Sequence, residues 1–304
     1  MSEDRTSIDF TIGSRRLLAV PRNLATVKFS LEDILAGSLP AMGDSETAAD
    51  GLRVLSVPRE HIDALLGSFP DHLAGGRQDY PRHYIDMAGS YEDYLARFSG
   101  KTRSTLKRKQ RKLAKECGGG YEVTEHRTPA ELEAFLDAAI PLSAKTYQAR
   151  LLDAGLPETP EARQSMLAKA ERGEMRCYLL CAGEKPIAYL TLPVEGQTLV
   201  YAYLGYDPEW ARLSPGTVLQ MEALERLFAE NRFRYFDFTE GDGGHKAMFG
   251  TDSVECASFV LLRKTIANRT LLGAREAFDA AVSGARTLAE KSGALSRVRG
   301  LLRA

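Results

Sequence analysis

The sequence predicts an α/β protein of the α+β kind, in which a mixed, mostly antiparallel central sheet is flanked by helices. Two observations support this fold class. Apolar residues alternate with a period of two over 175–206, and the segments on either side carry apolar residues at helical spacing. With 304 residues, 44% of them hydrophobic, the chain can bury one large core or two smaller ones.

The composition argues against several classes of protein. The longest apolar runs fall far short of the ~20 residues that cross a bilayer, and the N-terminus has no apolar signal region, so a cytoplasmic protein is expected. The four cysteines form no CxxC pair and have no histidine cluster as a partner, which argues against a zinc site or a disulfide scaffold. No metal site is therefore expected.

Residues 1–88 are expected to form a small α/β unit. Short extended runs at 7–12, 15–20, 52–57 and 83–87 alternate there with brief helical stretches and Gly/Pro breaks. At the other end, residues 264–304 contain eight basic and three acidic residues, and their apolar residues recur at helical intervals. This pattern predicts one or two basic amphipathic helices, which leaves 89–263 as the central domain.

Helix signals open the central domain. Ser90 can cap one helix, and a second helix is predicted over 102–116. Thr128 and Glu131 have the spacing of a capping box at the start of a third helix, and a fourth is predicted over 160–171. These helices precede the region in which the apolar period changes to two.

The predicted sheet begins with an antiparallel meander. Its strands are expected at 175–182, 185–193 and 197–206, joined by tight turns that contain glycine. A helix is predicted over 215–230. The core then ends with a strand over 234–239, a loop over 240–244 and a strand over 253–262.

The start of the 215–230 helix has the features of a phosphate-binding site. Ser214 suits the N-cap and Pro215 suits the first helical position, while Gly216 leaves backbone N–H groups open to a ligand. The positive end of the helix dipole favours a pyrophosphate, and Arg212 can add a charge-assisted contact. The alternative interpretation is an ordinary helix start that binds nothing.

This order of elements resembles that of the GNAT N-acyltransferases. Within that superfamily the chain is similar to the CelD/BcsL-like or BioF2-like group, which is related to the FemAB peptidyltransferases. Two positions depart from the family pattern: Arg212 lies four residues before Gly216, unlike the usual Q/R-x-x-G-x-G/A spacing, and His245 stands where many members have Tyr. The stretches that carry the resemblance are Ser90 to Lys109, Gly205 to Thr217 and Tyr235 to Phe249.

The resemblance implies a GNAT fold in which two central parallel strands, here 197–206 and 234–239, splay apart and admit the pantetheine arm of an acyl-coenzyme A. Acetyl-CoA or another acyl-CoA would then be a co-substrate, with no permanently bound cofactor. On the same view, residues 1–88 are a small unit or a degenerate first GNAT-like unit. The residues expected to bind the donor are Tyr206, Arg212, Ser214, Gly216 and Thr217.

Catalysis in such a fold is mainly positioning, assisted by a base that takes a proton from the amine. The candidate catalytic residues are Glu240, Asp237 and His245, which lie at or just past the second splayed strand. Asp237 should point away from the side shared by its two Phe neighbours. The alternatives are a solvated turn at Glu240, a structural carboxylate at Asp237 and a packing histidine at 245. Expected substrate-binding residues are Arg103, Lys107, Asp242 and Lys246.

A basic stripe covers the predicted helix over 101–115. It contains eight Lys or Arg and no acid, so with a net charge of −1 for the whole chain the remainder carries −9. Such a stripe suggests an anionic partner: an anionic acceptor, a tRNA, or an anionic membrane surface at the inner membrane face. A solvated helix without a partner is the alternative.

Three functional hypotheses follow from the sequence. The leading one is an acyl-CoA-dependent N-acyltransferase that acts on a small-molecule or glycan amine, such as an amino sugar in polysaccharide or envelope biosynthesis, where the substrate rests on the resemblance alone. The second is a FemAB-like transferase that uses aminoacyl-tRNA. The third is a non-catalytic GNAT-fold binding module. The sequence leaves the acyl length and the oligomeric state open.

Overall fold

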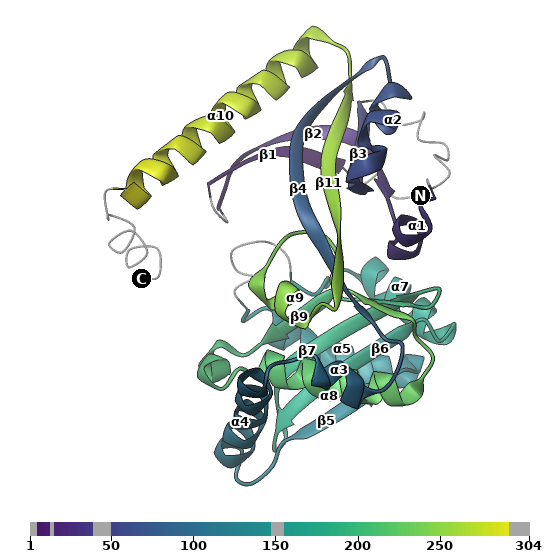
Figure 1. Cartoon of the computed structure of the whole chain (residues 1–304), viewed down its shortest axis with the longest axis vertical. Helices are drawn as coiled ribbons and strands as arrows, with labels where there is room; N and C mark the ends of the chain where they lie inside the picture. The colour runs from purple at the N-terminus through teal and green to yellow at the C-terminus, as the bar shows by residue number, and fades with distance from the viewer. Residues whose placement is uncertain (1–4, 13–14, 39–49, 147–154, 292–304) are drawn as a thin grey trace. The chain divides into compact units, whose positions relative to one another are not determined.

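The computed structural model describes residues 5–12, 15–38, 50–146 and 155–291. The chain divides into two compact units, one from Met1–Tyr80 and Glu255–Ala304 and the other from Pro81–Val254. The boundary falls within two long strands, β4 (His72–Asp86) and β11 (Asp252–Arg263) (Figure 1). The first unit thus combines segments from both ends of the chain, which the sequence analysis had treated as separate parts.

The first unit contains a sheet covered by one long helix. Leu272 of the helix is buried with Ile8, Leu24 and Leu262 of the sheet. Strand β2 pairs antiparallel with β1 and parallel with β3, which in turn pairs antiparallel with β11. The predicted helical positions beyond 291 lie outside the described residues. The elements are β1 (Arg5–Ile12), β2 (Arg15–Lys28), α1 (Leu31–Ala36), β3 (Gly51–Pro58), η2 (Arg59–His61), α2 (Ile62–Gly67) and α10 (Ile266–Lys291).

The second unit contains the mixed, mostly antiparallel sheet that the sequence predicts. Its strands follow the order β4, β10, β8, β7, β6, β5, and β9 also pairs with β7. Within this order β8 and β10 run parallel, and the other described pairs are antiparallel. The strands are β5 (Glu122–His126), β6 (Met175–Ala182), β7 (Lys185–Glu195), β8 (Thr198–Val200), β9 (Tyr203–Tyr206) and β10 (Tyr235–Asp237).

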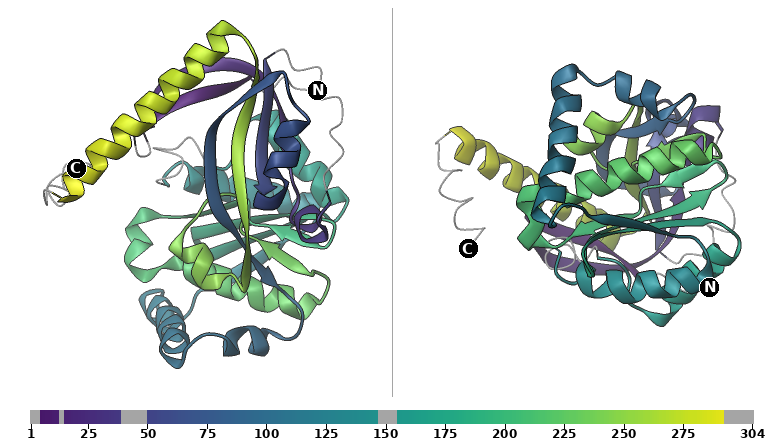
Figure 2. Two further views of the ribbon diagram at one scale, coloured as in Figure 1. Left: turned by 45° about the horizontal axis from the view of Figure 1, so that its top comes forward. Right: turned by 90° about the horizontal axis from the view of Figure 1, so that it is seen from below.

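Helices cover both faces of this sheet, as Figure 2 shows for α8 and α5. Successive side chains of β6 point to opposite faces of the sheet and so contribute to a hydrophobic core on each face. Tyr178 belongs to the same cluster as Leu224 of α8, whereas Cys177 packs with Phe135 of α5. The α8 side also carries α3 and α4, and the α5 side carries α7. The helices are α3 (Tyr91–Ala96), α4 (Gly100–Glu116), α5 (Pro129–Ser143), α7 (Pro160–Glu171), α8 (Pro215–Glu230) and α9 (Gly244–Phe249).

The helix caps follow the local sequence. Ser90 and Asp93 form a capping box at α3, and Thr128 and Glu131 form the predicted one at α5. Each box supplies acceptors for N–H groups that the first helical turn leaves unpaired. The helices at 160–171 and 215–230 have the predicted bounds.

The strand predicted over 197–206 is two strands. β8 pairs with the end of β7 at Val194 and with β10, whereas β9 pairs with β7 nearer its start, at residues 188–191. The strand breaks at Tyr201 and Ala202 because its pairing changes from β10 to β7 there. The N–H of Tyr201 still bonds to the carbonyl oxygen of Asp237 at 2.9 Å, whereas the N–H of Ala202 bonds to that of Thr191 at 3.2 Å. The strand predicted over 234–239 is correspondingly shortened to β10.

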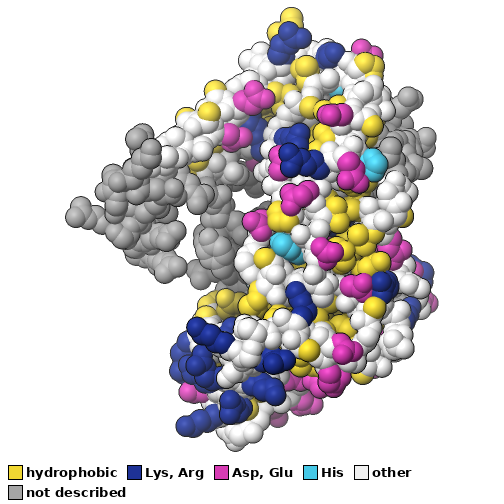
Figure 3. Space-filling view, in the orientation of Figure 1, with side chains coloured by type: hydrophobic (Ala, Val, Ile, Leu, Met, Phe, Trp, Pro, Cys, Tyr) yellow, Lys and Arg dark blue, Asp and Glu magenta, His cyan; other side chains and the backbone are white. Residues whose placement is uncertain are grey.

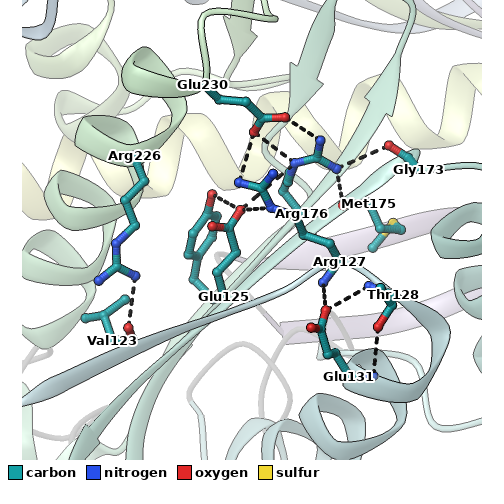
Figure 4. A network of polar contacts seen from close by, with 11 residues as sticks. Val123, Glu125, Arg127, Thr128, Glu131, Gly173, Met175, Arg176, Arg226 and Glu230 are labelled. Atoms are coloured by element: carbon teal, nitrogen blue, oxygen red, sulfur yellow. Dashed lines mark hydrogen bonds and ion pairs between the residues drawn. The ribbon is translucent and has the colours of Figure 1, made fainter.

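A partly buried ionic network fixes the C-terminal end of α8 to the sheet (Figure 4). Arg176 of β6 donates to Glu230 of α8, with Nη2–Oε1 at 2.6 Å, and Arg127 reaches the same carboxylate at 3.2 Å. Glu125 accepts from Arg127 and from the Tyr178 hydroxyl. Burial alone would raise the pKa of Glu230, but the hydrogen bond and charges of the two arginines hold it below its usual value. The network therefore fixes the axis of the helix whose other end carries the candidate site.

Candidate active site

The two central parallel strands diverge at the site predicted from the resemblance. β8 and β10 are in register from Thr198 with Tyr235 to Val200 with Asp237, and the Tyr201–Asp237 bond closes this ladder. Beyond it the chain turns toward β7 as β9, while the other strand leads into the loop before α9. The ring of Tyr201 contacts Phe236 and Phe238, with centroids 5.9 and 5.5 Å away.

The start of α8 differs from the prediction in one respect. Pro215 occupies the first turn and Ser214 is the N-cap residue, as expected, but the Ser214 side chain makes no capping hydrogen bond. The reason is its backbone, which is left-handed (φ 56°), whereas a capping serine uses an extended conformation. The first turn of α8 contains no acidic residue, so its N–H groups keep the positive potential that attracts an anion.

Gly216 is required by packing inside the protein. A Cβ at this position would lie 2.8 Å from Cδ2 of Leu204 and 3.3 Å from Cδ1 of Tyr206, both on β9. The glycine thus lets α8 approach the diverging strand. A large side chain at 216 would clash with β9 whether or not a ligand is bound, so such a variant cannot report on donor binding by itself.

Lys109 of α4 is the cation that contacts the α8 start. Its Nζ lies 3.4 Å from Oγ1 of Thr217 in the first turn, and burial lowers its pKa. Sequence reasoning had placed Arg212 at this position, but the Arg212 side chain is 65% exposed and pairs with Glu116 at 3.2 Å. Arg103 and Lys107, expected to bind substrate, are exposed on the same α4 helix.

His245 of α9 contacts α8 at Gln220, one helical turn beyond Thr217. Its Nε2 is 2.5 Å from Oε1 of Gln220, and its ring centroid lies 6.4 Å from that of Phe238 and 4.7 Å from that of Phe249. Burial, followed by the charges of Lys109 and a neighbouring lysine, lowers the pKa of this histidine. The imidazole is therefore neutral near pH 7. We refer to Lys109, Thr217, Gln220 and His245 as the α8 cluster.

Three more of the predicted residues lie in the loop before α9 (Glu240 and Asp242) and in α9 itself (Lys246). Lys246 donates to the backbone carbonyl of Glu240 at 2.5 Å, and burial lowers the lysine pKa. Asp242 is 69% exposed and lies 3.8 Å from Nε2 of His83. The far end of α9 is fixed by Tyr94, whose hydroxyl donates to the Phe249 carbonyl at 3.0 Å.

Asp237 forms a buried ion pair that the sequence did not indicate. Arg82 of β4 binds both carboxylate oxygens, at 3.1 and 2.5 Å, and both side chains are 1% exposed. The N–H of Thr239 also bonds to Asp237 at 2.8 Å, and Thr239 has a positive φ of 60°, which is rare for a β-branched residue. As predicted, Asp237 is directed away from Phe236 and Phe238, whose rings contact each other at 5.1 Å.

Comparison with known proteins gives the following matches. Residues 100–247 match the family described as the acetyltransferase (GNAT) domain. No curated protein sequence matches the chain. Among solved structures, L-PGS from Bacillus licheniformis is 14% identical, with a TM-score of 0.48 over 87% of this chain and 83% of that chain. FemX is 13% identical, with a TM-score of 0.49 over 79% and 81% of the two chains.

A third similar structure is a GCN5-related N-acetyltransferase from Kribbella flavida, which is 13% identical with a TM-score of 0.40 over 82% of this chain and 83% of that chain. Within the described ranges no helix is long and apolar enough to span a membrane. The same residues contain no group of three or more His, Cys, Asp or Glu that could hold a metal ion.

Proposed function

We propose that this chain, an acyltransferase whose residues 100–247 match the GNAT acetyltransferase domain, transfers an acyl group from an acyl-coenzyme A to an amine. The observation that carries the proposal is the α8 cluster itself. A helix start without acidic residues, a half-buried lysine and a neutral histidine meet beside two diverging strands. The helix start and the lysine are suited to bind a pyrophosphate, and the neutral histidine is suited to accept a proton from an amine.

The donor would bind with its pyrophosphate at the start of α8. The N–H groups of the first turn and the hydroxyl of Thr217 would hydrogen-bond to phosphate oxygens, and Lys109 would add a positive charge. The pantetheine arm would then enter between β9 and β10, with Tyr206 beside it. Arg212, once released from Glu116, could reach the outer phosphates.

The reaction needs one proton acceptor and one proton donor. The amine nitrogen attacks the thioester carbonyl carbon, the carbon–sulfur bond breaks, and His245 takes the proton that the amine loses. The imidazolium so formed at His245 then gives this proton to the leaving thiolate, which completes the transfer. Glu240 and Asp242 on the loop before α9, and Lys246 in the first turn of α9, would contact the acceptor. The assignment of an amino sugar as acceptor rests on the CelD/BcsL-like resemblance.

Calorimetric titration with acetyl-CoA and with a longer acyl-CoA tests the donor site. Lys109→Glu should weaken binding about 10- to 100-fold, since it replaces a charge-assisted contact with a repulsive one. Lys169→Glu, the same charge change on α7 at the opposite face of the sheet, is the matched control and should bind like the unmodified protein. Equal affinity in the two variants would refute this donor site.

One observation favours a second candidate function, transfer from a charged tRNA. Figure 3 shows a group of Lys and Arg side chains gathered over α4, a helix about 25 Å long. Except for Lys109, these cations are exposed, and none forms an ion pair with an acid within the described residues. They are Lys101, Arg103, Lys107, Arg108, Arg111, Lys112 and Lys115.

The apolar residues of α4 favour tRNA over a membrane surface as the anionic partner. Leu106 and Leu113 are buried in the core, so the exposed side offers no apolar anchor to a lipid interface. A tRNA titration at several salt concentrations gives the slope of the logarithm of the binding constant against the logarithm of the salt concentration. This slope should become shallower by about 3 when Arg103, Lys107 and Arg111 are changed to Glu together. An unchanged slope would exclude α4 as a nucleic-acid surface and leave acyl-CoA as the donor.

A further inference from the structure

Gln220 is a polar side chain at a position where α8 is otherwise apolar. Its neighbours Val218, Leu219 and Met221 belong to the core, and Gln220 itself is fully buried. A polar group buried at such a position normally has a hydrogen-bonding function. One side of the amide has such a partner, because Oε1 lies 2.5 Å from Nε2 of His245.

The other side of the same amide has no partner. Nε2 of Gln220 is buried and makes no hydrogen bond to any residue that the structure describes. An amide nitrogen carries two donor hydrogens, and a buried donor is costly when it is unpaired. A ligand carbonyl next to His245 would satisfy it, which indicates that the pair belongs to a binding site.

The contact fixes the proton on the imidazole. With the amide in this orientation its carbonyl oxygen faces Nε2 of His245 and can only accept, so Nε2 carries the hydrogen and, in a neutral ring, the lone pair lies on Nδ1. The charged groups that face the ring are Lys109 from α4 and Lys246 from α9, and Gln220 is the neutral group from α8. Both lysines oppose protonation and so help to keep the ring neutral.

We propose that Gln220 is the positioning residue for His245: it holds the imidazole in the Nε2–H tautomer, so that Nδ1 is the atom that takes the proton from the acceptor amine. This inference rests on the proposed function for its chemistry. The tautomer itself, however, is a property of the resting protein. It can be measured without any substrate.

Nitrogen-15 NMR of the histidine rings in the unliganded protein is the direct test. His245→Asn identifies the signals of residue 245, because they disappear in that variant. We expect Nδ1 of His245 in the unprotonated, pyridine-type range and Nε2 in the protonated, pyrrole-type range. The opposite pattern, or averaged shifts for both nitrogens, would overturn the proposal.

Two variants of Gln220 add measurements, the titration of His245 and the kinetics, that a role of Gln220 in packing alone would not change. In Gln220→Glu a carboxylate faces Nε2–H, so the pKa of His245 and the acidic limb of the pH–rate profile should both move upward by at least about one unit. In Gln220→Leu the tautomer preference should be lost, with kcat falling about tenfold or more while KM for the acceptor stays similar. An unchanged His245 titration in Gln220→Glu, in protein that melts as the unmodified protein does, would contradict the role.

The outcomes also separate this inference from the proposed function. The expected tautomer in a protein that turns over no acyl-CoA would refute the donor but keep the Gln220–His245 pair. Turnover of acyl-CoA by a protein whose His245 has the other tautomer would support the donor and refute the role of Gln220.

Discussion

Replacing His245 with asparagine is expected to lower kcat by about 10²- to 10⁴-fold while leaving acyl-CoA affinity nearly unchanged. In the proposed mechanism the ring takes the proton of the attacking amine, and asparagine has no group that can accept one at neutral pH. The proposed donor site is instead at the start of α8, where Thr217 lies one turn away from Gln220, the partner of the histidine. Steady-state kinetics and calorimetry on the same variant separate the two effects.

The pH dependence provides the control for this prediction. Burial and two nearby lysines lower the pKa of His245 from its ordinary value of about 6.5. A base works in its neutral form, so activity should be present above the lowered pKa and be lost only as the pH falls through it. This acidic limb should vanish from the residual activity of His245→Asn. A variant that retained both the rate and the limb would assign the base to another group, for which Glu240 is the next candidate.

Local signals explain why much of the fold could be predicted. Pro215 and Pro160 each stand in the first turn of a helix whose bounds were predicted correctly, and the capping box at Thr128 is formed as its spacing indicates. Such features depend on residues a few positions apart. The division of 197–206 into β8 and β9 depends instead on two different partners, and no local pattern specifies it.

The site residues that the sequence analysis missed differ in how detectable they were. Lys109 lies three residues after Leu106 and four before Leu113, so helical spacing alone puts it on the side of α4 that faces the core. Gln220 also had a signal, since it interrupts an apolar stretch of α8. The pairing of Arg82 with Asp237 had none, because 155 residues separate them and both lie in segments that read as ordinary strands.

The buried pair of Arg82 and Asp237 should show the largest effect on stability. Removing one partner, as in Arg82→Met or Asp237→Leu, leaves the other charge uncompensated in the interior and is expected to cost about 3–5 kcal/mol. Replacing both residues together should cost less than either single change, because no unpaired charge remains. Urea unfolding of the four proteins, analysed by linear extrapolation, measures the cycle.

A second arginine–aspartate pair between the same strand regions supplies the control. Arg234 binds Asp86 at 2.9 Å, but these side chains are 42% and 39% exposed, so Arg234→Met should cost no more than about 1 kcal/mol. Similar costs for the exposed and buried pairs would show that burial does not govern the effect.

The ion pair of Asp237 also bears on catalysis, because a carboxylate bound on both oxygens by an arginine is poorly suited to accept a proton. If Asp237→Asn leaves the pH–rate profile unchanged while lowering stability, Asp237 is a structural residue and His245 keeps the role of base.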